Sequence, residues 1–473
     1  MKKIIPLEYD YTIIGAGPAG MAAAITASEH GLRVLILDEQ PNAGGQIFRN
    51  IEGIEKTLNS EFRKLGDEYK SGWSLVKEFK KCGADYFNER SVWQIDKDLG
   101  IHHVSTTSNR VSSSIPSYIK TKNLLIAVGA MERPMPLPGW TLPGVMACTA
   151  VDALYKSSGL VPDKDVILAG SGPLLLLIAC RLLDAGVHIS ALLETNQRFA
   201  ILKALPFLPQ ALRSFSYLKR GISMIQKIRH AGIPIYTGIK SIEALGKSKF
   251  EKVRLKNGTE FVELSAGILL LHNGVVPNVQ ITRQLGCEHR WYDLQRYWEP
   301  VVDDWGNTSL DGVSIAGDCG RISGSSISEF TGHLAALDTV AKIGAISKVE
   351  RKQFSQPHRK ELSHHKAVRP FLDKLFQPGK SWLIPEQKET LVCRCEEVTV
   401  NDIRQAISMG AQSPDRIKSL VRCGMGPCQA RMCGLTVSEI LADERNISPE
   451  EVGYLKIRSP IKPITLGKLA EID

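Results

Sequence analysis

The chain has 473 residues, of which 43% are hydrophobic and 23% are charged, a composition typical of an ordinary globular protein with roughly three domains. Its net charge of +9 is mild and its basic residues are scattered, so a solvated surface is favoured over a nucleic-acid groove. No apolar run reaches the roughly 18 residues needed to span a bilayer, and the N-terminus does not resemble a signal peptide. We expect a cytoplasmic protein without an integral membrane segment, whose only membrane contact would be peripheral, at the inner membrane.

The first predicted element is a dinucleotide-binding unit, "YDYTIIGAGPAGMAAAITASEHGLRVLILDE", in which a strand, a glycine-rich turn, an alanine-rich helix and a second strand follow one another. The turn contains Gly15, Gly17 and Gly20. These glycines permit a tight turn, close approach of the pyrophosphate and packing of the helix on the strand, and the helix N-terminus faces the anion. An acid at the end of the second strand accepts hydrogen bonds from the ribose. Asp38 has the expected spacing, and Glu39 is its close competitor.

Three further segments indicate that this nucleotide is FAD. "DEQPNAGGQIFR", with Gly45 and Gln46, resembles the segment beside the flavin in flavoproteins with two dinucleotide domains. "LDGVSIAGDCG", with Gly317 and Asp318, resembles the strand and turn whose aspartate binds the ribityl chain in those proteins. "NLLIAVGA", which ends at Ala130, matches the crossover that leads out of their FAD domain. The alternative for Asp318 is a carboxylate on a surface turn.

A second strand–turn–helix–strand pattern, "KDVILAGSGPLLLLIACRLLDAGVHISALLE", covers residues 164–194. The duplication predicts an α/β fold with two Rossmann-like domains, the second inserted in the first. Gly170 and Gly172 are followed by Leu175 where the third glycine belongs, and a leucine there crowds the phosphates. We therefore expect a retained scaffold rather than a working nicotinamide site, although Glu194 still occupies the place of the ribose-binding acid.

The cysteines predict how electrons leave the flavin. Thioredoxin-reductase-like enzymes use a cysteine pair in the second domain, but "GVMACTAV" offers Cys148 alone. Near the end of the chain the sequence instead has two closely spaced pairs, which are Cys393 with Cys395 and Cys428 with Cys433. Four thiolates suit a [2Fe-2S] cluster, and a zinc site would use the same ligands. We favour iron because a flavoenzyme without a redox disulfide needs a one-electron outlet.

A third cysteine of this region is ambiguous. Cys423 and Cys428 also have the C-x4-C spacing, so the spacing leaves open whether Cys423 is a ligand or a bystander beside the cluster.

Taken together, "GAGPAG", "DEQPNAGGQIFR", "LPGWTLPGVM", "LAGSGPLLL" and "CRCEEVT…RCGMGPCQARMCG" resemble the A (alpha) subunits of bacterial opine oxidases that act on octopine and nopaline. The same subunit type occurs in hydrogen cyanide synthase and in heteromeric proline or hydroxyproline dehydrogenases. The resemblance covers nearly the whole chain. It prefers Cys428 and Cys433 as the second pair of cluster ligands, and the leucine in place of the third glycine belongs to the family pattern.

The resemblance implies a division of labour between subunits. A B (beta) subunit resembling amino-acid oxidases takes hydride from the C–N bond of the substrate, and this chain relays the electrons through FAD and the [2Fe-2S] cluster to an acceptor in the respiratory chain. Consistent with this, no catalytic residue is identified in this chain: packing explains His364, His365 and residues 290–298 as well as catalysis does.

Several alternatives stay open. The chain could be the alpha subunit of a proline or hydroxyproline dehydrogenase or of hydrogen cyanide synthase, a single-chain NAD(P)H-dependent flavin reductase, or a zinc-clamped structural partner. A further flavin or nucleotide could lie at the subunit interface or in the second domain.

The predicted domain boundaries complete the interpretation. Residues 1–140 and 265–350 form the FAD-binding domain, 141–264 the inserted second domain, 351–387 a helical linker, and 388–473 the [2Fe-2S] module with an extended tail. The prolines of the tail predict that it lies along another domain or a partner. Within the inserted domain, "FAILKALPFLPQALRSFSYLKRGISMIQKIRHAG" is basic and striped with apolar residues, and it either packs internally or docks a partner.

Overall fold

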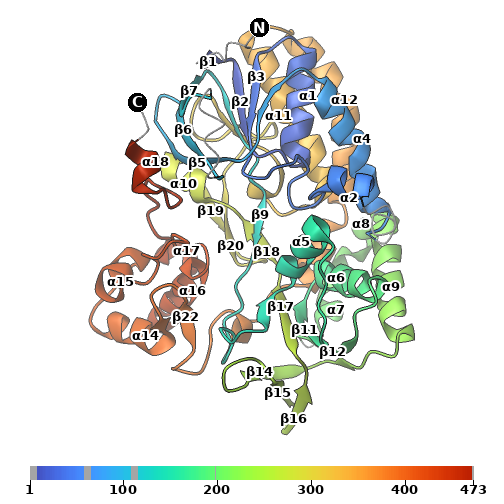
Figure 1. The fold of residues 1–473 in the computed structure, drawn as a ribbon, viewed down its shortest axis with the longest axis vertical. Helices are drawn as coiled ribbons and strands as arrows, with labels where there is room; N and C mark the ends of the chain where they lie inside the picture. Colours follow the sequence, from blue (N-terminus) through green and yellow to red (C-terminus); the bar gives the residue numbers. More distant parts are fainter. Residues whose placement is uncertain (1–7, 58–64, 108–114, 198, 471–473) are drawn as a thin grey trace.

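The computed structural model describes residues 8–57, 65–107, 115–197 and 199–470. Figure 1 shows two lobes along the long axis, with a third, smaller body, orange to red, that the C-terminal part of the chain forms beside the lower lobe. Within the described residues no helix has the length and apolar character needed to cross a membrane.

The first lobe is built on a parallel sheet of five strands. In spatial order these are β21 (Val313–Ile315), β8 (Leu124–Ile126), β2 (Tyr11–Ile14), β3 (Val34–Leu37) and β4 (Asp85–Phe87). Residues of β2, β3, β8 and β21 are buried without alternation, because helices or further strands cover both faces of such a sheet. A second sheet of the same lobe has the order β1 (Glu8–Tyr9), β7 (Tyr118–Thr121), β6 (Gly100–Ser105), β5 (Arg90–Ile95).

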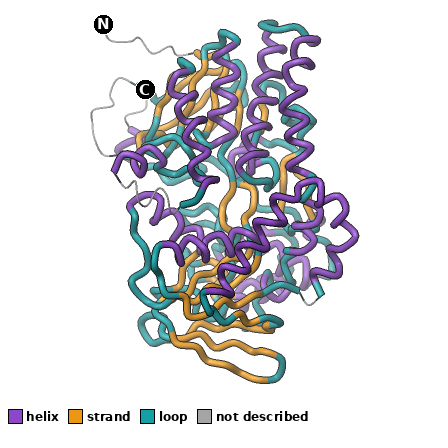
Figure 2. The backbone as a smooth tube through the Cα atoms, turned by 90° about the vertical axis from the view of Figure 1, so that its right-hand side faces the viewer, coloured by secondary structure: helices purple, strands orange, loops and turns teal. Residues whose placement is uncertain are grey.

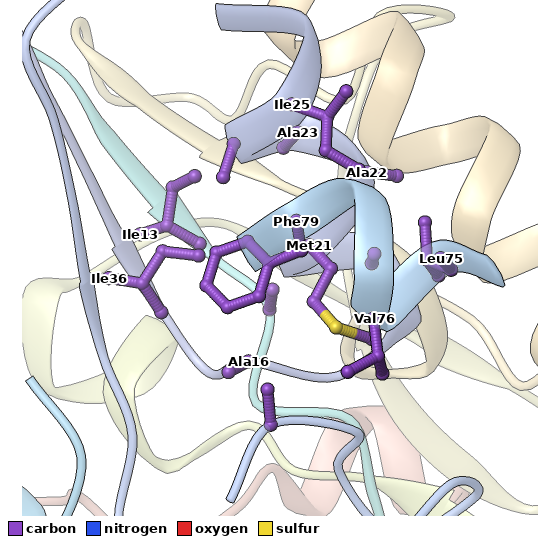
Figure 3. Close-up of a cluster of buried hydrophobic side chains, with 14 of the residues drawn as sticks. Ile13, Ala16, Met21, Ala22, Ala23, Ile25, Ile36, Leu75, Val76 and Phe79 are labelled. Carbon is purple, nitrogen blue, oxygen red and sulfur yellow. The ribbon is translucent and has the colours of Figure 1, made fainter. Parts of the chain in front are cut away.

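Helix α1 (Pro18–Glu29) is the centre of the first lobe. It packs between α11 (Ser325–Ile343) and α4 (Asp67–Lys81), and α12 (Lys348–Lys366) lies beyond α11. Figure 3 shows Met21 of α1 gathered with Val76 and Phe79 of α4 against the sheet residues Ile13 and Ile36. The small side chains of this alanine-rich helix let its neighbours approach closely.

The second lobe repeats this plan with strands that lie between β8 and β21 in the sequence. Its parallel sheet has the order β10 (Val145–Ala147), β17 (Ile268–Asn273), β11 (Val166–Ser171), β12 (Ile189–Glu194), β13 (Ile235–Tyr236). The helices α5 (Cys148–Ser158), α6 (Pro173–Asp184) and α9 (Phe215–His230) pack on it, and an antiparallel sheet of β14 (Ile239–Leu245), β15 (Lys252–Asn257) and β16 (Glu260–Ser265) extends from its lower end. The predicted fold class, with the second Rossmann-like unit inserted in the first, is confirmed.

One helical extension of the second lobe precedes α9. It consists of α7 (Ala200–Ala204), η2 (Leu205–Phe207), α8 (Leu208–Ala211) and η3 (Leu212–Ser214). Its inner face packs on α13 (Arg369–Leu375), which follows α12.

The two lobes are joined by the antiparallel pair β9 (Ala130–Glu132) and β18 (Val275–Pro277), which lies between the lobes in Figure 1. Arg133, buried at the end of β9, donates hydrogen bonds to the carbonyls of Asn273 at 3.0 Å and Arg296 at 2.8 Å. The side chain thereby ties the crossover to the hairpin of β19 (His289–Tyr292) and β20 (Tyr297–Pro300). In that hairpin the rings of Trp291 and Trp298 meet edge to face at 5.6 Å, which supports a packing role for residues 290–298.

The C-terminal body is small and mainly helical. Its elements are β22 (Leu391–Cys393), β23 (Val398–Thr399), α14 (Val400–Ser408), α15 (Pro414–Val421), α16 (Gly434–Arg445) and α17 (Pro449–Val452). Thr399 and Ser448 form capping boxes with Asp402 and Glu451, so the starts of α14 and α17 are specified locally. The tail then returns to the first lobe, where the amide of Ile461 bonds the carbonyl of Trp93 at 2.9 Å and α18 (Leu466–Ala470) follows. The prediction that the tail lies along another domain is confirmed.

Candidate functional site: a dinucleotide cradle and a cysteine cluster

The glycine turn at the start of α1 can be made only by glycine at two positions. Gly15 has φ +105°, and a Cβ there would lie 2.5 Å from the carbonyl oxygen of Ala127. A Cβ on Gly20 would lie 1.9 Å from the carbonyl oxygen of Gly15. Gly45, in the second glycine loop, approaches so closely that its Cβ would lie 2.8 Å from the Cα of Gly17. The two loops thus meet at the N-terminus of α1, where backbone N–H groups and the helix dipole suit a pyrophosphate.

The two candidate ribose acids face different ways. The buried carboxylate of Asp38 accepts a hydrogen bond at 2.5 Å from the amide of Ala16, inside the glycine turn. Burial raises the pKa of Asp38. Glu39 instead accepts from the hydroxyl of Ser91 at 2.7 Å and pairs with Lys462 of the tail. This geometry favours Asp38 for contact with a nucleotide at the turn and gives Glu39 a part in fixing the tail.

Gly317 and Asp318 lie against the same helix. Gly317 has φ +78°, and a Cβ there would lie 3.0 Å from the Cβ of Ala19 in α1. One carboxylate oxygen of Asp318 accepts from the amides of Ser323 at 2.7 Å and Gly324 at 3.0 Å, at the start of α11. Burial raises the pKa of Asp318, so its environment is that of a partly enclosed site, not of a freely solvated turn.

Gln46 and Ala130 occupy the edges of this region. The side-chain oxygen of Gln46 accepts from Arg49 at 2.9 Å, and its backbone carbonyl accepts from Lys156 of the second lobe at 3.2 Å. Ala130 pairs with Pro277 in the crossover. The structure therefore gathers the glycines, Asp38 and Gly317 around α1, whereas direct contact of Gln46 or Ala130 with a flavin stays a prediction.

Sequence reasoning missed a buried ion cluster next to the loop of Gly45 and Gln46, the predicted flavin loop. Asp152 accepts from Lys156 at 2.6 Å and from Arg181 at 2.7 Å, and the three side chains are 11%, 3% and 7% exposed. Burial lowers the pKa of Lys156 to about 8. The Asp152–Lys156 spacing on α5 was a readable signal for a pair, but Arg181 comes from α6 and joins the pair only through the fold.

The second glycine turn keeps the shape of the first. A Cβ on Gly170 would lie 1.7 Å from the carbonyl oxygen of His272, and Gly172 precedes α6 with φ +107°. Leu175 is 2% exposed and belongs to the buried core of this lobe, so the leucine is accommodated by packing. Glu194 accepts from the side chain of Asn196 at 2.6 Å. The scaffold is retained, as predicted, whereas its lack of a working nicotinamide site stays a prediction.

Three cysteine thiols converge in the C-terminal body. The sulfur atoms of Cys393, Cys423 and Cys433, all buried, lie within 4.8 Å of one another. Hydrogen bonds from Cys423 and Cys433 lower the pKa of Cys393, and the same contact raises the pKa of Cys433. Such a group of thiols, one of them readily ionised, has the donor chemistry of a thiolate metal centre.

The other two predicted ligands lie beside this trio. Cys395 is exposed and Cys428 is half-buried. Burial and the neighbouring thiol of Cys395 raise the pKa of Cys428, and the charge of Cys393 acts on it in the same direction. The fold thus brings all five cysteines into the C-terminal body, but the sulfur atoms that lie within 4.8 Å of one another are those of Cys393, Cys423 and Cys433. The favoured bystander Cys423 therefore belongs to the trio, and the predicted ligands Cys395 and Cys428 lie beside it. The trio with Cys395 and Cys428 beside it offers enough thiols for a four-cysteine iron–sulfur cluster or a zinc ion, and the choice of Cys393, Cys395, Cys428 and Cys433 as the ligands stays a prediction.

Charged and aromatic contacts join the cysteine body to the first lobe and the crossover. Arg296 pairs with the buried carboxylate of Glu439, with its Nε at 2.9 Å. The guanidinium of Arg283 lies between the rings of Trp298 and Tyr454, at 4.8 and 4.7 Å from their centroids. These buried charged and aromatic contacts fix the position of the cysteines relative to the flavin-type fold.

The remaining cysteines have no partner thiol. All ten cysteines are free, and Cys148 is fully buried. Burial raises the pKa of Cys148 well above its usual range, which makes it an inert core thiol. The predicted lack of a redox pair in the second lobe agrees with this geometry.

Comparison with known proteins identifies the family. Residues 9–333 match the family model described as pyridine nucleotide-disulphide oxidoreductase, and residues 387–472 match the sarcosine oxidase A3 domain. The A (alpha) subunit of opine oxidase from Rhizobium meliloti is 40% identical over 98% of this chain and 88% of that protein. Hydrogen cyanide synthase subunit HcnB of Pseudomonas aeruginosa is 30% identical over 96% of each chain. The resemblance to this subunit type is confirmed.

A solved structure supports the fold along the whole chain. L-proline dehydrogenase from P. horikoshii superposes with a TM-score of 0.68 at 20% identity, covering 99% of this chain and 81% of that one. The chain is therefore a flavin-type oxidoreductase that belongs to the pyridine nucleotide-disulphide oxidoreductase family and, within it, to the group of enzyme subunits that includes the A (alpha) subunits of opine oxidases.

Proposed function

We propose that this chain is the electron-transferring subunit of a heteromeric oxidoreductase that cleaves the C–N bond of an opine such as octopine or nopaline. A partner subunit resembling amino-acid oxidases takes hydride from the substrate, and this chain passes the electrons to an acceptor of the respiratory chain. The resulting imine hydrolyses, which for octopine releases arginine and pyruvate.

The observation that carries the proposal is the cluster of cysteines fixed beside a flavin-type fold that has no redox thiol pair in its second lobe. The named relatives are subunits of opine oxidase and of hydrogen cyanide synthase, which supports a role in a complex. Bound FAD would accept a hydride equivalent, and an iron–sulfur cluster would carry single electrons onward.

The chain's own residues would bind and shield these groups. The glycine turn and the N-terminus of α1 would hold the pyrophosphate, Asp38 would meet the ribose, and Asp318 would meet the ribityl chain. For the cluster we propose Cys393, Cys395, Cys428 and Cys433 as ligands, a set that follows the family resemblance, with Cys423 packed against them. Burial of Cys393 and Cys433 would keep water away from that side of the cluster.

An anaerobic absorbance titration tests the proposal. The purified chain is mixed with octopine, nopaline, proline, hydroxyproline or glycine, each without and with its partner subunit, and flavin absorbance is followed. Bleaching by an opine only in the presence of the partner is the expected result. Bleaching by proline, hydroxyproline or glycine instead would move the chain to a proline dehydrogenase or a hydrogen cyanide synthase.

The same titration with NADH tests the alternative that this chain is a single-chain NAD(P)H-dependent flavin reductase. Leu175 in place of the third glycine predicts that NADH leaves the flavin oxidised. Rapid bleaching of the isolated chain by NADH would show a working nicotinamide site in the second lobe and would replace the proposed function.

A further inference from the structure

The helical extension and the helix α9 that follows it, together residues 199–230, have an apolar outer face that the fold leaves uncovered. The inner face of the extension is packed within the fold, because Ala204 and Ala211 are fully buried against Val368 and Phe371. The outer face carries large apolar side chains that are each 46–61% exposed: Ile201, Leu202, Leu205, Leu212, Phe215 and Ile222. Internal packing therefore accounts for only one of the two faces of this segment.

The charge of this segment is of one sign. Between Glu194 and Glu243 the sequence contains lysines and arginines but no aspartate or glutamate. The extension lies on the right-hand flank of the second lobe in Figure 1, the side that faces the viewer in Figure 2. Short helices with exposed leucine, isoleucine and phenylalanine beside basic residues are typical of segments that lie in the interface of a bilayer.

A basic pocket opens next to the apolar face. It has a volume of about 310 Å³ and lies between the extension and α12. Arg213, Arg359 and Lys366 line it together with the polar side chains of Gln210 and Ser363, and no acidic residue lines it.

Within the described residues the three cations of this pocket are without an ion pair, and the carboxylate of Asp304 acts on Lys366 only from beyond ion-pair distance. In the part of the chain that the structure describes, none of them has a carboxylate within ion-pair distance; Arg359 lies over the ring of Trp305 at 4.2 Å and reaches only the backbone oxygen of Asp304. Elsewhere on the surface similar cations are paired, for example Lys252 and Arg254 with Glu263. A pocket with three unpaired cations and hydroxyl and amide groups suits a phosphate monoanion or diester.

We propose that the basic pocket and the apolar face of residues 201–222 form one surface that binds an anionic phospholipid bilayer. The phosphate of a lipid headgroup enters the pocket, where Arg213, Arg359 and Lys366 neutralise it, and the apolar side chains of the neighbouring helices enter the acyl boundary. The surface attaches the protein to the membrane from one side without a spanning segment. Arg220 and Lys227 of α9 are already paired with Glu68 and Asp184, but the segment itself carries no acidic residue and, among the residues that the structure describes, the cations of the pocket are left without an ion pair. Charge complementarity therefore selects a uniformly anionic surface over a protein partner.

Vesicle flotation tests the surface with the full chain as purified with its cofactors. The chain is mixed with vesicles of phosphatidylcholine alone or of phosphatidylcholine with phosphatidylglycerol. Binding only to the anionic vesicles, weakened by added salt, is expected. The double variant Arg213→Gln, Lys366→Gln should bind roughly 20- to 30-fold more weakly, at about fivefold for each cation removed.

Two matched controls separate this surface from general effects. Lys247→Gln, Lys249→Gln removes two exposed cations from the β14–β15 hairpin, and should leave vesicle binding within about twofold. Leu212→Ser, Phe215→Ser should abolish flotation even at low salt, whereas Phe261→Ser, a phenylalanine of similar exposure on β16, should not change it. Thermal melting of each variant shows that the fold is kept.

Three results would overturn the proposal. The first is equal binding to neutral and anionic vesicles. The second is unchanged flotation of both surface variants. The third is binding of inorganic phosphate in the pocket, measured by calorimetry, without any binding of vesicles. If the surface variants instead release the partner protein of the complex and leave flotation intact, the face is a protein interface.

Discussion

The buried carboxylate of Asp152 should be essential for the stability of the second lobe. Its side chain lies between Lys156 and Arg181, which are 3% and 7% exposed. Asp152→Asn keeps the shape of the side chain but leaves two buried cations without a counter-charge. Removing one partner from a buried ion pair costs about 3–5 kcal/mol, because the remaining charge stays desolvated. We therefore expect Asp152→Asn to lower the free energy of unfolding by about 3 kcal/mol or more.

The chain offers a matched control on its surface. Glu263 also bridges a lysine and an arginine, Lys252 at 2.5 Å and Arg254 at 2.9 Å, but all three side chains are 38–42% exposed. Exposed pairs contribute about 0.2–1 kcal/mol each. Glu263→Gln should therefore cost far less than Asp152→Asn, although both variants remove one carboxylate from two cations at similar distances.

The assay is urea unfolding followed by circular dichroism, with release of bound FAD as a second readout. FAD release is informative because Lys156 also donates to the carbonyl of Gln46, and Asn50 donates to the carbonyl of Ser157 at 3.0 Å, so the cluster supports the predicted flavin loop. Adding Lys156→Met to Asp152→Asn removes one of the two uncompensated cations and should restore part of the lost stability.

The effect of Asp152→Asn on stability should weaken in acid. Burial raises the pKa of Asp152, but the neighbouring cations outweigh it, so the pKa of Asp152 is lowered in the fold. Its carboxylate therefore stabilises the fold fully above the unfolded pKa of about 4. That stabilisation is lost as the pH falls through the folded pKa. The difference in the free energy of unfolding between the wild type and Asp152→Asn should therefore shrink as the pH falls into the acid range. Equal costs for Asp152→Asn and Glu263→Gln at neutral pH would refute the reasoning.

Three further predictions concern the cofactor sites. Cys428→Ser should abolish the iron–sulfur absorption and electron paramagnetic resonance signals while FAD stays bound, whereas Cys423→Ser should keep the cluster; loss of the cluster from Cys423→Ser alone would make Cys423 a ligand. Cys148→Ser should leave the rate of flavin reduction unchanged, and a slower rate would show that this thiol takes part. Gly20→Ala places a methyl group 1.9 Å from a carbonyl oxygen and should yield protein that is depleted of FAD and destabilised by about 1–3 kcal/mol. The control Gly221→Ala, whose Cβ meets nothing within 4 Å, should retain FAD and gain about 0.5–1 kcal/mol in stability. Equal FAD content in the two glycine variants would contradict the close packing of the turn.

The sequence by itself was enough for the repeated units of the fold. Each dinucleotide-binding unit occupies about 30 consecutive residues, in the order strand, glycine turn, helix and strand. The atoms that exclude a side chain at Gly20 belong to the same turn, so the need for glycine there can be recognised in the sequence. The close approach of β21 to β8 was readable as well, because the second unit interrupts a recognisable first one. Local patterns of this kind survive in the sequence because each needs particular residues at fixed spacing.

The cysteine cluster was only partly readable. Spacing and family resemblance pointed to Cys393, Cys395, Cys428 and Cys433, and the structure gathers them in one body. Spacing could not show that Cys423 lies within 4.8 Å of Cys393 and Cys433, because that proximity depends on how α14 and α15 fold the two ends of the module together.

Burial and long-range pairing were decided by the tertiary structure. Arg181 meets Asp152 across 29 residues, and Lys462 meets Glu39 across 423. The same holds for the outer face of residues 201–222, whose stripe of apolar residues predicts an amphipathic helix but does not say which side remains exposed. The periodicity of a sequence predicts that a helix or strand has an apolar face and a polar face. Which neighbour each face contacts is determined only when elements far apart in the chain pack together, because the face that is buried then leaves the other face for solvent, lipid or another protein.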